Sequence, residues 1–275
     1  MKIFKFTLIA ISLLLIGCGS GSSKSNTSEL TSIKTIDDAK SSYKALNSFE
    51  TINNINSGYN NFSQKIQKIQ KVNSVSEKCV YGGNINFYTS EDQKSIEISY
   101  EQCKDMNEVY INGTIKMYYE DENHGMITFS NYTEKDIDKE EYLDIVMKWN
   151  EDNNIEKTEI NGIIKQTSKE DGINNISFKN MIITEKDTYN ESWININGGI
   201  GLESKCTTGN YQFKTIEKLV EAKDGTENTE SGILNINGAT YTFNNPYVTI
   251  KTSTEEKTLL QSELEKEMES SNSCK

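Results

Sequence analysis

The sequence predicts a mainly β protein with helices at both ends of the chain. Apolar and polar residues alternate from Cys79 to about Lys251, which is typical of antiparallel strands. Before residue 75, and again in the tail, apolar residues instead recur every three or four positions, as on one face of a helix. We therefore expect a curved antiparallel sheet or an open half barrel, with a long N-terminal helix and a short C-terminal helix.

Residues 35–75 form the expected N-terminal amphipathic helix. Thr35 and Asp38 resemble a capping box, with Asp in the place of Glu. Gly58 could bend this helix or divide it. We expect the apolar stripe to pack on the sheet, and a coiled-coil partner is the alternative. The stripe consists of Ile36, Ala39, Tyr43, Leu46, Phe49, Ile52, Ile55, Tyr59, Phe62, Ile66, Ile69 and Val72.

The expected β domain spans residues 76–252 and contains a repeated triplet. Ile-Asn-Gly occurs at 111–113, 160–162, 196–198 and 236–238. Either each Asn-Gly is a two-residue hairpin turn, or each Gly is a bend inside a long strand. We favour the bend, because folding the chain at the polar turn 169–172 places Gly162 opposite Phe178. An aromatic ring across a strand glycine is a known device of curved sheets.

The tail, residues 253–275, is expected to return to helix. Ser253 and Glu256 have the spacing of a capping box. Leu260, Leu264 and Met268 follow at four-residue intervals and would share one face of this helix.

The first 17 residues have the features of a secretory signal. Lys2 and Lys5 precede an apolar core of 11 residues, Phe6 to Ile16, whereas a membrane span needs roughly 20. The core ends in Leu15-Ile16-Gly17-Cys18, which resembles the lipobox of bacterial lipoproteins. The alternative is an ordinary signal peptide that happens to contain a cysteine.

The resemblance implies that Cys18 is lipidated and becomes the first residue of a mature chain of 258 residues. Acyl chains on this residue would hold the protein in a membrane, since each buried CH₂ contributes about 0.8 kcal/mol. Residues 18–34, rich in Gly, Ser and Thr, would be a flexible tether. Gly19 stands where an Asp would favour the inner membrane in enteric bacteria, so we expect a cell-envelope location at the outer membrane.

Four further cysteines remain in the exported chain: Cys79, Cys103, Cys206 and Cys274. An even number in an oxidising compartment indicates disulfides, and three pairings are possible. We favour Cys79–Cys103, which brackets one expected hairpin, and Cys206–Cys274, which would tie the tail to the body. A zinc site would need closer spacing of its ligands.

Composition excludes several classes of function. The formal charge is −12 and the chain contains no arginine, so nucleic acid is not an expected partner. The single histidine, His124, lies in an expected turn and leaves no two-histidine metal site. The densest acidic cluster fits a solvated loop better than a calcium site. It comprises Asp136, Asp138, Glu140, Glu141 and Asp144.

No catalytic motif or cofactor site is recognisable, and we expect no enzymatic activity. Aromatic residues such as Tyr118, Tyr119, Trp149 and Trp193 could pack the core or line an apolar cavity. The expected architecture loosely resembles the half barrel and helix of periplasmic lipoprotein carriers and receptors. We therefore expect an anchored protein that binds an apolar ligand or an envelope partner. The alternative is a surface-exposed structural or adhesive lipoprotein.

Overall fold

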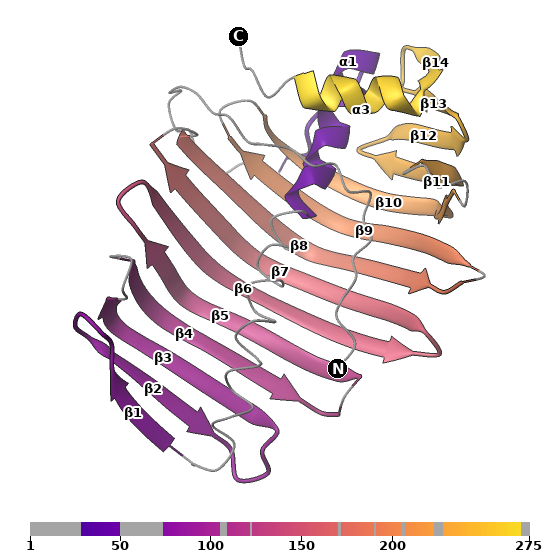
Figure 1. Cartoon of the computed structure of the whole chain (residues 1–275). Helices are drawn as coiled ribbons and strands as arrows, with labels where there is room; N and C mark the ends of the chain where they lie inside the picture. Colours follow the sequence, from indigo (N-terminus) through magenta and orange to yellow (C-terminus); the bar gives the residue numbers. More distant parts are fainter. Residues whose placement is uncertain are drawn as a thin grey trace.

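A computed structural model describes residues 29–49, 74–104, 109–121, 123–169, 172–189, 191–204, 207–222 and 228–270. It contains one open sheet of 14 strands in sequence order, in which every neighbouring pair is antiparallel (Figure 1). The mainly β antiparallel prediction is therefore confirmed. Within these ranges, two short α-helices and a 3₁₀ helix accompany the sheet, and neither α-helix is long and apolar enough to cross a membrane.

The strands lengthen toward the middle of the sheet and shorten again at its C-terminal end. Their bounds are β1 Ser74–Lys78, β2 Asn84–Thr89, β3 Ser95–Lys104, β4 Tyr110–Tyr119, β5 His124–Lys135, β6 Lys139–Asp152, β7 Ile155–Ser168, β8 Gly172–Asp187, β9 Ser192–Glu203, β10 Thr208–Glu221, β11 Thr229–Ile236, β12 Ala239–Asn244, β13 Tyr247–Lys251 and β14 Glu256–Leu260. The helices are α1 Ile36–Tyr43, η1 Lys44–Asn47 and α3 Gln261–Ser270.

Alternation along the strands gives the sheet one apolar face and one outer face. In β6, Leu143, Ile145 and Met147 are buried, whereas Asp144, between the first two, and Lys148, directly after Met147, are exposed. The same alternation runs through the neighbouring strands: the β6–β7 register is continuous, and the β5–β6 and β7–β8 pairs each contain one register shift. The core therefore consists of the apolar face of a single sheet and the N-terminal helical segment that packs on it.

Helix α1 packs on the apolar face at the C-terminal end of the sheet (Figure 1). The Tyr43 ring lies 5.5 Å from that of Tyr241, and the Phe49 ring lies 6.4 Å from that of Phe178. The buried Tyr241 hydroxyl donates to the Ala39 carbonyl at 2.6 Å, which ties α1 to β12. The expected packing of the stripe on the sheet therefore holds for its described part.

The start of the N-terminal helix agrees with its sequence signal. Thr35 Oγ1 accepts from the Asp38 N–H at 3.1 Å, and Asp38 Oδ2 accepts from the Thr35 N–H at 2.9 Å. This is the predicted capping box. The α-helix gives way to η1 at Lys44. Of the long helix predicted over 35–75, residues 50–73 lie outside the described part of the chain, and its expected end is wrong because Ser74 and Val75 pair with β2 as the start of β1.

Three of the four Ile-Asn-Gly triplets mark bends and the fourth marks a turn. Gly113, Gly162 and Gly198 lie inside β4, β7 and β9 with φ of 97°, 134° and 129°. Gly162 is paired with Phe178, as expected, and Gly198 is paired with Phe213. Gly238, in contrast, belongs to the two-residue turn between β11 and β12.

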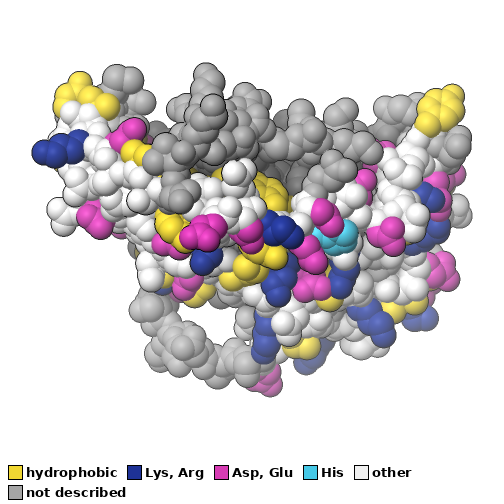
Figure 2. Space-filling view, turned by 90° about the horizontal axis from the view of Figure 1, so that it is seen from below, with side chains coloured by type: hydrophobic (Ala, Val, Ile, Leu, Met, Phe, Trp, Pro, Cys, Tyr) yellow, Lys and Arg dark blue, Asp and Glu magenta, His cyan; other side chains and the backbone are white. Residues whose placement is uncertain are grey.

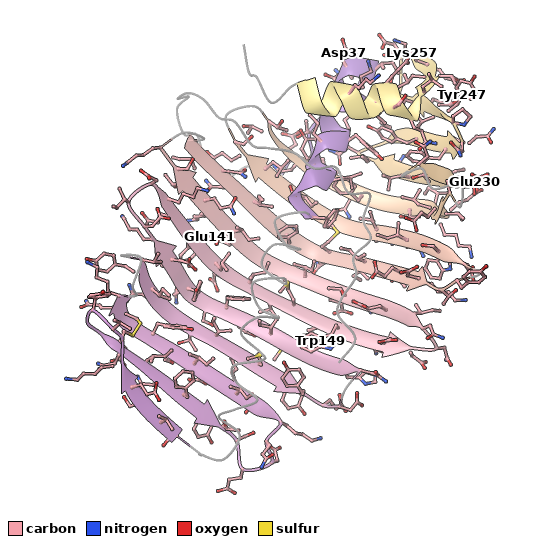
Figure 3. All side chains as sticks on the ribbon, viewed as in Figure 1. Asp37, Glu141, Trp149, Glu230, Tyr247 and Lys257 are labelled. Carbon is pink, nitrogen blue, oxygen red and sulfur yellow. A yellow bond between two sulfur atoms is a disulfide. The ribbon has the colours of Figure 1, made fainter. Side chains whose placement is uncertain are left out.

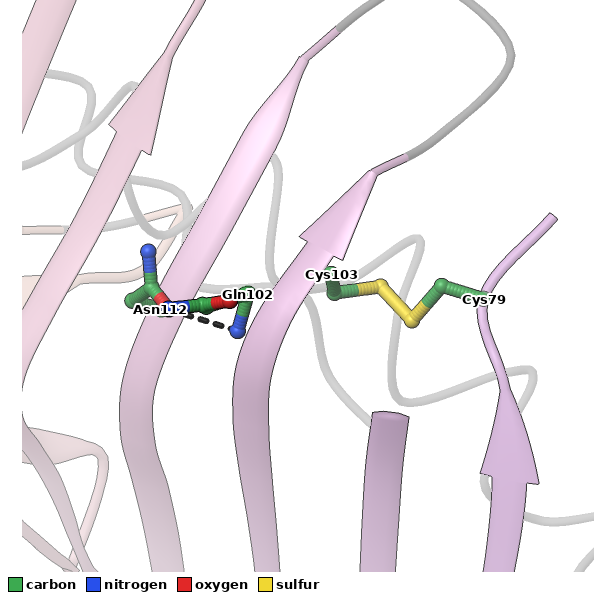
Figure 4. The surroundings of a disulfide bond; sticks show 4 residues. All are labelled: Cys79, Gln102, Cys103 and Asn112. Carbon is green, nitrogen blue, oxygen red and sulfur yellow. Dashed lines mark hydrogen bonds between the residues drawn. A yellow bond between two sulfur atoms is a disulfide. The ribbon is translucent and has the colours of Figure 1, made fainter. Parts of the chain in front are cut away.

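In two triplets, the asparagine side chain accepts a hydrogen bond from a bulge residue in the neighbouring strand. Gln102 and Asn180 are extra residues with left-handed φ that interrupt the ladder, so their N–H groups lose their strand partners. Asn112 Oδ1 accepts from the Gln102 N–H at 2.6 Å (Figure 4), and Asn161 Oδ1 accepts from the Asn180 N–H at 2.7 Å. The repeat thus combines a glycine in one strand with a bulge in the adjacent strand, and together they bend the two strands at the same place.

The tail differs from its prediction. Residues 256–260 form β14, with Leu259 buried opposite Val248, and α3 begins only at Gln261. Ser253 and Glu256 therefore do not cap a helix. The physical reason is that β13 offers a free edge, and pairing with it buries Leu259 while Leu260 stays exposed.

A disulfide joins Cys79 and Cys103, with their Cα atoms 5.4 Å apart (Figure 4). It links the end of β1 to β3 across the intervening hairpin, as predicted. Cys18, Cys206 and Cys274 lie outside the described residues. The Cys206–Cys274 pairing remains a prediction.

Candidate functional site

A small pocket lies between η1 and the ends of strands β8 to β11. Its volume is about 80 Å³. Tyr43 and Leu46 form the helical side, and Ile194, Ile196 and Leu219 line it from the sheet. The polar lining includes Glu185, Asp187, Ser192, Trp193 and Glu221. Apolar side chains from two different elements therefore meet a few polar groups, which is the usual composition of a ligand site.

Carboxyl groups from adjacent strands lie side by side next to this pocket. Glu151 is paired with Glu156, and Glu156 with Glu185, on the apolar face of the sheet. Side chains directly opposite each other in an antiparallel pair have Cβ atoms about 5 Å apart, so like charges there are unfavourable. Glu185 is the member of this row that lines the pocket.

Burial and this like charge keep the carboxyl groups protonated to an unusually high pH. Burial, with the negative charges of Glu156 and Asp187, raises the pKa of Glu185 to about 8. Burial, together with the charge of Glu151, raises the pKa of Glu156 to about 7, although a hydrogen bond from Thr158 opposes the shift. Near neutral pH, Glu185 is therefore mostly a neutral group that can donate a hydrogen bond.

This carboxyl group should make the stability of the protein depend on pH. The folded pKa of Glu185 lies above its ordinary value of 4.5, so folding favours the protonated form. Its stabilisation is complete below about pH 4.5 and is lost as the pH rises through 8. We expect the melting temperature to fall from pH 5 to pH 9, and to fall less in Glu185→Gln. Glu159→Gln on the outer face is the control, and an unchanged slope in Glu185→Gln would contradict the assignment.

Trp193 borders the same pocket, but it is paired with Lys186 and Val220, so its side chain lies on the outer face, opposite to that of Ile194. Lys218 Nζ lies 5.1 Å from the centre of its ring. Glu191 accepts from Lys218 at 2.6 Å and from Lys186 at 2.7 Å, and these two ammonium groups lower the pKa of Glu191 to about 2. Within the described part of the chain, Trp193 Nε1 is buried and has no hydrogen-bond partner. An unpaired buried donor is costly and needs an explanation.

The opposite end of the long strands carries a second polar group on the apolar face. Glu141 and Trp149 mark the two ends of β6 in Figure 3. Glu141 is paired with Glu134 and accepts from Gln166 at 2.8 Å, and burial raises its pKa. The Tyr132 hydroxyl donates to Glu134 at 3.1 Å. Gln166 and Tyr132 donate hydrogen bonds to these carboxyl groups, so the group gives no indication of a ligand site.

The polar residues that the sequence singled out do not converge on one site. His124 lies at the surface near acidic side chains, with Nδ1 2.7 Å from Asp121 Oδ1 (Figure 2). Asp136 instead accepts from the N–H groups of Asp138 and Lys139 in the β5–β6 turn. No three His, Cys, Asp or Glu side chains in the described ranges are grouped so that they could hold a metal ion.

The predicted aromatic residues separate into three places. Tyr119 and Trp149 stack edge to face on the apolar face, with ring centres 5.7 Å apart. Tyr118 is 39% exposed on the outer face, and Trp193 borders the pocket. The sequence identified Trp193 only as one aromatic residue among many. It did not identify Glu185, because the β7–β8 register determines that Glu185 lies opposite Glu156.

A second, larger groove of about 530 Å³ lies beside the N-terminal segment. Residues 30–34 form one side of it, and Asn237, Gly238, Thr240 and residues 251–253 form the other. The segment is fixed there by hydrogen bonds such as that from Asn237 Nδ2 to the Thr31 carbonyl at 2.8 Å. Despite its size, this groove brings no opposing apolar walls together, so we place the candidate site in the smaller pocket.

No protein-family model matches this chain, and no curated protein or solved structure is significantly similar to it.

Proposed function

We propose that this protein is a non-enzymatic lipoprotein of the cell envelope that binds an apolar ligand or an apolar part of an envelope partner. The lipobox-like segment ending at Cys18 supports the anchor, and its Gly19 supports the outer membrane. The acidic body, with no arginine and a formal charge of −12, is expected to be repelled by anionic lipid head groups. Attachment would then depend on the acyl chains of Cys18.

The observation that carries the ligand proposal is the pocket between η1 and the sheet. Leu46 from the helical side and Ile194 and Leu219 from the sheet offer apolar contact, while Glu185 adds a hydrogen-bond donor near neutral pH. A volume of about 80 Å³ is far below the roughly 300 Å³ at which ligand pockets usually begin. Only one end of a ligand would enter a pocket of this size.

We further propose that the sheet is the wall of an open half barrel covered by the helix predicted over 35–75. Phe49 lies near Phe178 on β8, and the chain must then reach β1 at Ser74. Seven strand spacings of about 4.8 Å make about 34 Å. The 24 intervening residues would span about 36 Å as a helix. This match supports an apolar stripe that crosses the sheet.

The alternative is a surface-exposed structural or adhesive lipoprotein. It is favoured by tyrosines on the outer face, where Tyr88 is 52% exposed and Tyr118 is 39% exposed. Exposed aromatic side chains are common at the centres of binding surfaces. In this alternative the ligand would lie on the outer face and the pocket would have no role.

Native mass spectrometry of the full chain, released from mild detergent, tests the proposal. We expect the wild type to carry a non-covalent apolar compound and Ile194→Trp, which fills the pocket, to retain at least tenfold less. Ile163→Trp is the matched control, since Ile163 is 37% exposed on the outer face. A wild-type protein without any bound compound would contradict the proposal, as would equal retention by Ile194→Trp.

A further inference from the structure

Residues 29–34 bind to one particular end of the sheet. The strands are antiparallel and in sequence order, so the turns after odd-numbered strands share one end and the turns after even-numbered strands share the other. Thr31 and Asn210 exchange hydrogen bonds of 2.9 and 2.8 Å at the start of β10. The Ile36 N–H donates to Glu255 in the β13–β14 turn at 2.7 Å. We call this end, where the odd-numbered strands finish, the tether end.

Large apolar side chains are exposed at the tether end. Val80 is 67% exposed in the β1–β2 turn, Ile137 is 69% exposed in the β5–β6 turn, and Ile173 is 58% exposed beside the β7–β8 turn. Leu30, in the segment bound to this end, is 52% exposed. These turns follow the left side of the sheet in Figure 1. At the opposite end, Tyr189 is the one large apolar side chain exposed in the described residues of the β2–β3, β4–β5, β6–β7 and β8–β9 turns.

The turns that carry these side chains have a fixed backbone. The disulfide between Cys79 and Cys103 holds the β1–β2 turn against β3, and the Tyr81 N–H donates to the Lys104 carbonyl at 3.1 Å. In the β5–β6 turn, the Asp136 carboxylate accepts from two backbone N–H groups of the same turn. The apolar tips are thus already in place, so little ordering is needed when they enter a partner.

The two ends of the sheet differ in charge. At the opposite end, the same four turns and the strand residues that flank them contain one lysine, Lys94. The tether end mixes both signs, and Lys135 pairs with Glu140 at 2.9 Å and Lys169 with Asp138 at 2.8 Å. An anionic lipid surface therefore repels the opposite end more strongly than the tether end. The exposed acids of the opposite end are Glu91, Asp92, Glu120, Asp121, Asp152 and Asp187.

We propose that the tether end lies against a phospholipid surface, with Leu30, Val80 and Ile137 among the lipid head groups and the acidic end directed away. The inference rests on the proposed lipid anchor and names the face through which the anchored body meets its membrane. Cys18 lies 11 positions before Glu29, and a tether of that length and composition would span about 18 Å. Strand β10, with 14 residues, is about 46 Å long, so the acyl chains would enter the membrane near the tether end.

The spacing of the apolar tips favours a lipid surface over a protein partner. The β5–β6 and β7–β8 turns are two strands apart, about 10 Å, and the β1–β2 turn is about 19 Å beyond them. A protein partner would need a contiguous apolar patch. Separate tips can each enter the interfacial layer of a bilayer, where the Tyr81 ring and the neighbouring Lys78 and Lys139 are also favourable.

Tryptophan placed at either end tests this inference in the lipidated full chain, reconstituted into phosphatidylcholine vesicles. Ile137→Trp and Val80→Trp place an indole at the tether end, and Tyr189→Trp, at a residue that is 99% exposed, is the matched control at the opposite end. The emission added to that of the wild type is compared between ordinary and brominated phosphatidylcholine, because bromine quenches an indole that it contacts. We expect both tether-end variants to lose at least about half of the added emission, since an interfacial indole lies beside the upper acyl chains. Tyr189→Trp should lose less than about one tenth.

Flotation of the vesicles separates this inference from the proposed function. If the wild type floats with the vesicles, but either tether-end variant is quenched no more than Tyr189→Trp, the inference is overturned and the lipid anchor stands. If the wild type does not float, the lipid anchor itself is contradicted and the inference falls with it. The three substituted side chains are exposed, so far-UV circular dichroism should be the same in all variants.

Discussion

Gly198→Ala is expected to lower the free energy of unfolding by at least about 3 kcal/mol. Gly198 has φ of 129°, a region that side chains with a Cβ rarely adopt. A Cβ at this position would also overlap the backbone of Asn180 and Met181 in the neighbouring strand. Neither contact is with a flexible side-chain end, so the strand itself would have to move. Denaturant unfolding followed by circular dichroism measures the loss.

The adjacent glycine provides a matched control. At Gly199 the nearest atoms to an added Cβ are 3.5 Å away, and its φ is not in the left-handed region. Gly199→Ala is therefore expected to change stability by no more than about 0.5 kcal/mol. Similar losses in both variants would show that the triplet glycine has no special role as a bend.

Cys18→Ala is expected to abolish firm attachment of the protein to the cell envelope. Without the thiol there is no site for the acyl chains, each of which contributes about 0.8 kcal/mol per buried CH₂. The acidic body offers no compensating attraction to anionic lipids. Fractionation of cells, with the full chain detected in soluble and envelope fractions, measures the change.

Cys79→Ala serves as the control for this loss. It removes the Cys79–Cys103 disulfide but leaves the lipobox-like segment intact, so attachment should persist. If Cys18→Ala sediments with the envelope as firmly as the wild type, the anchor lies elsewhere and the resemblance to lipoproteins is misleading.

Features that depend on a few neighbouring residues, such as a helix cap or a glycine bend, could be predicted from the sequence. The Thr35 and Asp38 spacing predicted a capping box that the structure contains, and the bend expected at each Ile-Asn-Gly is found at three of its four positions. The fourth, at Gly238, became a hairpin turn because β12 begins immediately after it. The same dipeptide suits both uses, and the neighbouring strand decides between them.

Features that depend on distant pairing could not be predicted. The apolar spacing of Leu260 and Leu264 suggested one helix, but the edge of β13 recruits residues 256–260 into a strand. Glu156 and Glu185 are 29 positions apart in the chain, and their facing follows from the complete register of β7 and β8, including its bulge. The unpaired N–H of Trp193 likewise depends on the packing of several elements.

The most direct test of the account is to locate the ligand on the native protein. A long-chain alcohol with a photoactivatable diazirine near its hydroxyl group is added to isolated envelopes, and the labelled residues are identified by mass spectrometry of peptides. We predict labelling of peptides that contain Leu46, Ile194 or Leu219. Labelling concentrated on the outer face around Tyr88 and Tyr118, or no labelling above background, would contradict the account.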